Sequence, residues 1–249
     1  MRALKMEFFK TKHKKIPLVC LAFILVQLIW FSVDLPHLSE SDLSQGWQFL
    51  LYNIILIDAI MLPMAAGVIA SRSCEIEHKG NTLKLLETLQ TPRSIYHAKL
   101  IWGTLYLLIT LLLRAAVFTV FGFTVGFSDP FPLGEMLLTT ALSFLVSVTI
   151  YLLEQNLALL FSNQAIALVV GIFGSFAGFL SLLFPPWVQK LLIWGYYGVI
   201  SPIGMNWDPN TRISDFFWRQ PDWSGVILTL FWFIALFFVG RRLFQKKSA

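Results

Sequence analysis

The sequence predicts an all-α membrane protein, and three observations lead to this fold class. Hydrophobic residues make up 57% of the 249 positions and charged residues only 13%, which is more apolar surface than a soluble core of this size can bury. Six apolar stretches reach the roughly 17 to 25 residues that a helix needs to cross a bilayer. They do not alternate as barrel strands do, so a helical bundle is the remaining way to satisfy the backbone in lipid.

The six expected transmembrane helices cover residues 16–33, 49–70, 100–126, 134–161, 165–184 and 223–240. The first is expected to be retained rather than cleaved as a signal peptide, because no small-residue cleavage site lies near its end and five spans follow. We expect the whole chain, 1–249, to form a single transmembrane domain. Three further segments are distinguished within it: an N-terminal interfacial segment, 1–15, a polar loop, 71–99, and an aromatic-rich loop, 185–222.

The distribution of Lys and Arg orients these helices. The segments 1–15, 71–99 and 241–249 together hold fifteen basic residues, whereas the segments on the opposite side hold three. Because basic residues stay in the cytosol when loops are short, both termini are predicted to be cytosolic. The net charge of +5 then comes from basic residues on the cytosolic side, where they face anionic lipids. No nucleic-acid partner is needed to explain it.

The segment 71–99 is the long polar stretch on the predicted cytosolic side. Asn81 can cap a short helix from Thr82 to about Gln90, and Pro92 ends it. The helix would be amphipathic, with an apolar face made by Leu85, Leu86 and Leu89 and a polar face made by Lys84 and Glu87. The pattern alone favours an interfacial helix that only organises the loop.

The residues around this helix follow a recurring order. Glu-x-Glu is followed after four residues by Thr-x-Lys-x-Leu, then by Pro-Arg and a later Lys99. With the basic segment 1–15 before the first span, this order resembles the permease subunits of type 2 ABC exporters. More narrowly, it resembles the lantibiotic-immunity permeases of gram-positive bacteria.

The resemblance implies a coupling helix over 82–89 that docks into a cleft of a separate ATPase subunit. The residues matched to this role are Glu75, Glu77, Thr82, Lys84, Leu85, Leu86, Leu89 and Arg93. The implied partners are an ATPase dimer, a second permease subunit of a different chain, an amphipathic peptide and the lipid bilayer of the bacterial plasma membrane. Segment 1–15 resembles the family's interfacial helix, and a simple basic membrane anchor fits it equally well.

The sequence does not predict an enzyme. It lacks the Gly-x-x-x-x-Gly-Lys-Ser/Thr loop, so we expect no cofactor in this chain and assign ATP and Mg²⁺ to the partner ATPase. The expected spans contain no histidine for a haem, and no His-Glu-x-x-His zinc motif is present. Cys20 and Cys74 lie near or in the predicted cytosol, where thiols stay reduced, so neither a disulfide nor a metal pair is expected.

Three charged residues fall well inside the expected spans, namely Asp58, Arg114 and Glu154. Such residues are costly in lipid and should face the bundle interior or water. At about 1.5 Å of rise per residue, Asp58 and Arg114 lie at similar depths and could pair. The pair could set helix register or line a substrate path, while Glu154 lies close to the cytosolic boundary and could border an inner gate.

Two further features concern packing. Gly171, Gly174 and Gly178 allow close helix approach in the fifth span, which favours packing within the chain over contact between two permeases. Residues 187–200 are apolar but too short to span, so a re-entrant or interfacial helix is expected before the sixth span. The aromatic residues expected at the outer headgroup layer are Trp187, Trp194, Tyr196, Tyr197, Trp207, Trp218 and Trp223.

Taken together, the residues and the resemblance predict a permease subunit of an ATP-driven exporter that expels lantibiotic-type peptides from the membrane. A permease for bacitracin-like drugs, lipids or ions is the alternative within the same class. A membrane scaffold or sensor without transport is the alternative from a different class.

Overall fold

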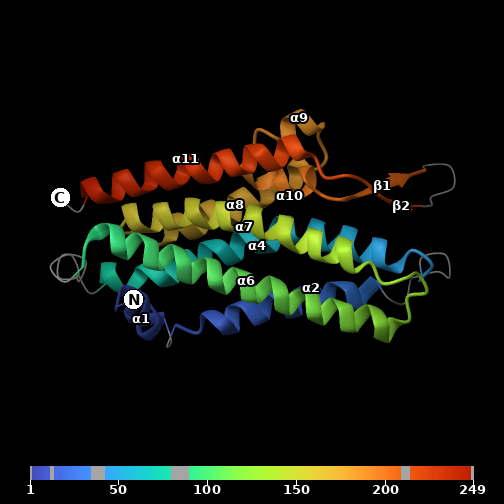
Figure 1. Cartoon of the computed structure of the whole chain (residues 1–249), viewed down its shortest axis with the longest axis horizontal. Helices are drawn as coiled ribbons and strands as arrows, with labels where there is room; N and C mark the ends of the chain where they lie inside the picture. The colour runs from blue at the N-terminus through green and yellow to red at the C-terminus, as the bar shows by residue number, and fades with distance from the viewer. Residues whose placement is uncertain (1, 12–13, 35–42, 80–89, 209–213, 248–249) are drawn as a thin grey trace.

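The computed structural model describes residues 2–11, 14–34, 43–79, 90–208 and 214–247 (Figure 1). In chain order the elements are α1 (Arg2–Thr11), α2 (Ile16–Asp34), α4 (Gly46–Lys79), α6 (Pro92–Val125), α7 (Leu133–Leu160), α8 (Ala165–Ser181), α9 (Pro186–Gln189), η2 (Ile193–Gly195), α10 (Tyr196–Val199), β1 (Ile203–Trp207), β2 (Ser214–Trp218) and α11 (Trp223–Lys247).

Among these described elements, five helices are long and apolar enough to cross a membrane: α2, α4, α6, α7 and α11. The predicted fifth span corresponds to α8, which is apolar but only 17 residues long. Backbone hydrogen bonds at Leu182, Leu183 and Phe184 continue this helix by about one tighter turn. The prediction of six spans therefore remains a prediction at α8.

The long helices run side by side, with the two ends of the chain at one end of the bundle and the β1–β2 hairpin at the other (Figure 1). We call these the termini end and the hairpin end. Helices α4 and α7 occupy the centre: 72% and 67% of their most apolar windows are buried, against 17% for α11. The lipid-facing surface is thus provided mainly by α2, α6 and α11, together with the exposed face of α8.

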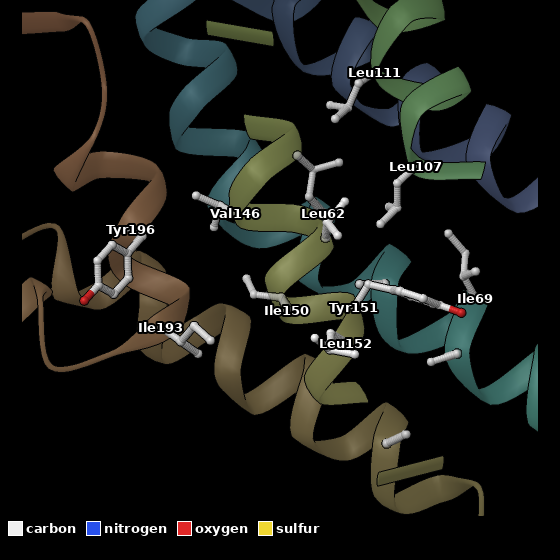
Figure 2. Packing of buried hydrophobic residues seen from close by; sticks show 14 of the residues in the cluster. Leu62, Ile69, Leu107, Leu111, Val146, Ile150, Tyr151, Leu152, Ile193 and Tyr196 are labelled. Atoms are coloured by element: carbon white, nitrogen blue, oxygen red, sulfur yellow. The ribbon is translucent and has the colours of Figure 1, made fainter. Parts of the chain in front are cut away.

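The core lies where α4, α6 and α7 meet, and Figure 2 shows this packing from close by. Its members include Leu62 and Ile69 from α4, Leu107 and Leu111 from α6, and Val146, Ile150, Tyr151 and Leu152 from α7. Lipid tails are as apolar as these side chains, so close packing and polar contacts, rather than the hydrophobic effect, must hold such helices together.

The small residues of α8 are used for packing within the chain. A Cβ at Gly171 would lie 3.2 Å from the carbonyl oxygen of Pro63 on α4, and a Cβ at Gly174 or Gly178 would run into Trp194. The indole of Trp194, which follows α9, therefore lies in the groove that these glycines leave. The predicted intramolecular packing is present.

The segment 185–222 requires a correction to the predicted all-α fold. In place of a continuous helix over 187–200, the structure has three short helical pieces, α9, η2 and α10. They are followed by an antiparallel hairpin, in which Ile203 pairs with Trp218 and Trp207 with Ser214. Proline at the start of α9 and the glycines of η2 and α10 limit helix length here.

The aromatic residues of this segment divide into two groups. Trp187, Trp207, Trp218 and Trp223 are exposed, as expected for a membrane-interface layer. Tyr196 and Tyr197 are buried, because their hydroxyls bond to the Lys190 carbonyl and to Ser147 Oγ, each at 2.9 Å. Their assignment to the surface layer was wrong.

Candidate functional site

The predicted coupling residues lie at the termini end, around the connection between α4 and α6. Thr82, Lys84, Leu85, Leu86 and Leu89 fall outside the described residues. Glu75 lies in the last turns of α4, Glu77 follows two residues later in the same helix, and Arg93 is exposed in the first turn of α6. The structure therefore places the residues that flank the predicted coupling helix and leaves that helix untested.

The predicted loop boundaries of 71–99 were too wide. Helix α4 continues to Lys79 and α6 begins at Pro92, so the connection between them covers only residues 80–91. Pro92 starts a helix instead of only ending one, because Thr91 caps α6 by accepting a hydrogen bond from the Ser94 amide. Cys74, expected in a loop, is fully buried within α4.

Three elements meet directly at the base of this connection. Lys99 Nζ of α6 donates to Glu7 Oε2 of α1 at 3.2 Å and to the Ser73 carbonyl of α4 at 2.6 Å. Lys99 is fully buried and Glu7 is 3% exposed. A second cation, Lys10, also contacts the Glu7 carboxylate at 3.2 Å. We refer to Glu7, Ser73 and Lys99 as the basal cluster.

Aromatic contacts hold α1 in the same place. The ring of Phe8 stacks on Trp102 of α6 with centroids 5.4 Å apart, and Trp102 Nε1 donates to the Leu4 carbonyl at 2.7 Å. Tyr106 Oη donates to Thr11 Oγ1 at 3.4 Å one helical turn further along. The N-terminal segment is thus a helix packed against α6, which a purely lipid-bound anchor would not require.

Glu75, near the end of α4, is also held from two sides. Glu75 Oε2 accepts a hydrogen bond from Lys14 Nζ at 3.1 Å and lies 3.7 Å from Arg72 Nη1. A cavity of about 510 Å³ opens beside it, bordered by Arg72, Glu75 and the turn at 162–165 between α7 and α8. This end of the bundle therefore presents charged groups around a hollow surface.

A second polar cluster lies halfway along the bundle, where Asp58 of α4 forms a salt bridge with Nη1 of Arg114 on α6. Gln27 Nε2 of α2 and Ser143 Oγ of α7 also donate to the Asp58 carboxylate, at 3.1 and 3.0 Å. The pairing expected from depth is present. We refer to Gln27, Asp58, Arg114 and Ser143 as the central cluster, and it joins four helices at one level.

The two clusters are in register on the antiparallel helices α4 and α6. Ser73 and Asp58 are 15 residues apart on α4, and Lys99 and Arg114 are 15 residues apart on α6. Both spacings correspond to about 22 Å of helix. The pair is therefore fastened at two levels.

Glu154, predicted near an inner gate, and the two residues that follow it, Gln155 and Asn156, are all buried in α7. Asn156 joins α7 to two neighbours by accepting from Tyr96 Oη at 2.9 Å and donating to the Leu236 carbonyl at 3.0 Å. Glu154 faces α8, where its Oε1 would lie 3.5 Å from a Cβ at Gly171, and neither of its oxygens has a partner among the described residues. Asn156 thus fixes helices α6 and α11, and the gate assignment stays a prediction.

Sequence reasoning missed the partners of Lys99. Glu7 is the single acidic residue within the basic segment 1–15, and an isolated acid among cations was the available signal. Lys99 was assigned to the cytosolic loop, although the apolar residues that flank it are consistent with burial.

Comparison with known proteins adds a finding. Residues 3–178 match a family model described as ABC-2 family transporter protein. The match begins in α1, includes both polar clusters and ends within α8, ahead of the segment 185–222. No curated protein matches the chain.

Proposed function

We propose that this chain, which belongs to the ABC-2 family of transporter proteins and is the membrane component of an ABC transporter, is an exporter permease that expels lantibiotic-type peptides. The peptide class is proposed from the resemblance of segments 1–15 and 71–99 to the lantibiotic-immunity permeases. An ABC-2 permease works with an ATPase. We assign ATP and Mg²⁺ binding to a separate ATPase dimer, and we infer a second, different permease chain as partner. No covalent chemistry is assigned to this subunit.

The basal cluster is the observation that carries the coupling part of the proposal. It ties α1, α4 and α6 together directly beneath the connection 80–91, where an ATPase would act. Helices α4 and α6 each have 34 residues, or about 51 Å. This exceeds a hydrocarbon core of about 30 Å, so both helices can extend beyond the bilayer toward a cytosolic partner.

We propose that both termini and the connection 80–91 are cytosolic, with α8 completing six spans. The excess of Lys and Arg at the termini end supports this orientation. ATPase closure would push on residues 82–89, and the two clusters would keep α4 and α6 in register as the helices move. The resulting tilt would open the outer leaflet side to an amphipathic peptide.

The coupling proposal is tested by replacing Leu85 and Leu86 with Asp and measuring co-purification of the ATPase. We expect loss of the ATPase with normal membrane insertion. The matched control is Leu191→Asp, which adds one acid to an exposed leucine at the hairpin end and should leave the ATPase bound. Retention of the ATPase by the double variant would contradict the proposal. A phenotype that persists when the ATPase is lost would also contradict it, because a scaffold or sensor without transport would behave in this way.

The substrate is tested separately. A sensitive bacterium expressing the complete transporter should survive higher concentrations of a nisin-like peptide but not of bacitracin. Protection against bacitracin alone would favour a drug permease. Equal sensitivity to both, with ATPase activity stimulated by lipids or ions, would favour a lipid or ion permease. Adjacent genes for an ATPase, a second permease and lantibiotic synthesis would support the assignment independently.

A further inference from the structure

A cavity at the hairpin end is used by none of the roles described above. It has a volume of about 300 Å³ and lies between the first turns of α4, the segment α9–α10 and the start of the hairpin. Its apolar wall includes Ile55 and Leu56 of α4 and Leu182 just after α8, and its polar wall includes Arg219 and Asp222. The cavity therefore combines an apolar surface with a cationic group and a carboxylate.

Arg219 is held in a fixed position at this cavity. Its Nε donates to the Ser201 carbonyl and its Nη2 to the Gly198 carbonyl, both at 2.8 Å. The Arg219 amide also donates to the Pro202 carbonyl at 2.9 Å. Nη1 makes no hydrogen bond to any described residue, so the guanidinium is oriented by one edge and keeps donors for another molecule.

The guanidinium remains charged in this setting. Desolvation by burial lowers the pKa of Arg219 from its ordinary value, but an arginine pKa starts above about 12, so the group is cationic at neutral pH. A charged donor with open hydrogen-bond capacity is suited to phosphate or carboxylate oxygens.

The neighbouring carboxylate does not neutralise this site. Asp222 accepts hydrogen bonds from the Ser224 amide and hydroxyl through Oδ1, and Lys190 Nζ lies 2.6 Å from its Oδ2. The hydrogen bond from Lys190 is the main reason why the pKa of Asp222 falls to about 2. Its negative charge is therefore matched by Lys190, which leaves the charge of Arg219 available.

The surroundings place the cavity at the level of lipid headgroups. The exposed rings of Trp187, Trp207, Trp218 and Trp223 surround the hairpin end, and tryptophan collects at the membrane–water boundary. Helix α8 ends and helix α11 begins at this end of the bundle. The most abundant molecules at this level that join an anionic group to an apolar tail are phospholipids.

We propose that this cavity binds the headgroup of a membrane phospholipid, with the phosphate on Arg219 and the first part of an acyl chain along Ile55, Leu56 and Leu182. The volume is at the lower end of the about 300 to 1,000 Å³ found for small-molecule sites, which suits a headgroup whose chains remain in the bilayer. The site is independent of the exported substrate, so it stands or falls separately from the proposed function.

Lipid binding to the purified chain, measured by native mass spectrometry, tests the proposal. Phosphatidylglycerol should bind the wild type at least roughly tenfold more tightly than Arg219→Gln, because charge-assisted hydrogen bonds to phosphate are lost. Diacylglycerol with the same acyl chains, which lacks the phosphate, should bind both proteins equally. Arg242→Gln removes an exposed cation of α11 at the termini end, away from the cavity, and should stay within twofold of the wild type.

A second variant keeps the test decisive if Arg219→Gln does not fold. Leu56→Trp fills the apolar wall while retaining Arg219, and it should weaken phosphatidylglycerol binding to a similar extent. Wild-type affinity in the folded variants would overturn the proposal. An equal loss in Arg242→Gln would show general surface attraction instead, and displacement of the lipid by millimolar inorganic phosphate would show a free-phosphate site.

Discussion

Replacing Lys99 by Met tests whether the basal cluster fastens α1, α4 and α6. The substitution keeps an unbranched side chain of similar volume and removes the amine, so the Ser73 carbonyl loses a donor at 2.6 Å and Glu7 loses one of its two cations. Removing one partner of a buried ion pair costs about 3 to 5 kcal/mol. Because Lys10 still neutralises Glu7, we expect the lower figure, about 3 kcal/mol.

For a protein of this size, a loss of about 3 kcal/mol corresponds to a fall in melting temperature of about 6 to 12 °C. Thermal unfolding of the detergent-purified protein measures it. Lys10→Met is the matched control, because its side chain is 20% exposed against 0% for Lys99, so water screens this pair more and its loss should cost less than the loss of Lys99. The double variant Glu7→Gln/Lys99→Met removes both charges and should recover more than half of the loss. Equal effects of the Lys10 and Lys99 variants, or no recovery in the double variant, would refute the reasoning.

Three other predictions concern separate parts of the fold. Asp58→Asn leaves its arginine partner unpaired at mid-bundle and should destabilise the protein by about 3 to 5 kcal/mol in thermal unfolding. Gly174→Ala pushes a methyl group into the indole above it and should cost about 1 to 3 kcal/mol by overpacking, whereas Gly134→Ala, where a Cβ meets open space, should be neutral. The pKa of Asp222 is lowered from 3.8 to about 2, chiefly by its hydrogen bond from Lys190, so its stabilising contribution is present above about pH 3.8 and is lost as the pH falls toward 2; an NMR titration should show this midpoint, and Lys190→Gln should raise it.

The membrane helices could be predicted from the sequence because their signal is local. Long apolar runs need no tertiary information to be assigned, and all five long helices found coincide with expected spans. The ends of α4 and α6 could not be placed in this way, since residues 71–79 and 92–99 are polar helix that hydropathy does not distinguish from loop. Pro92 was the readable signal, because proline after a Thr favours a helix start.

The two polar clusters differ in the same way, because one could be predicted from the sequence and the other could not. Asp58 and Arg114 could be paired from depth alone, since a charge inside a span has few other ways to be satisfied. Glu7 and Lys99 are 92 residues apart, and no local pattern connects them. The hairpin was missed because the aromatic residues of β1 and β2 fit a membrane-interface layer as well as strands.

Two polar clusters at equal spacing give α4 and α6 a specific register that apolar packing alone would not. In lipid, a slip of one helical turn, about 5.4 Å, exchanges one apolar contact for another at little cost. The same slip would separate Lys99 from the Ser73 carbonyl and Arg114 from Asp58 together, leaving buried charges at both levels without these partners.

Between the clusters, Pro63 removes one backbone hydrogen bond from α4, so bending of this helix is easiest between two levels that are each fixed. A push on residues 80–91 would therefore be carried as a rigid displacement to the basal cluster and then as a tilt at Pro63, where α4 packs on Gly171 of α8.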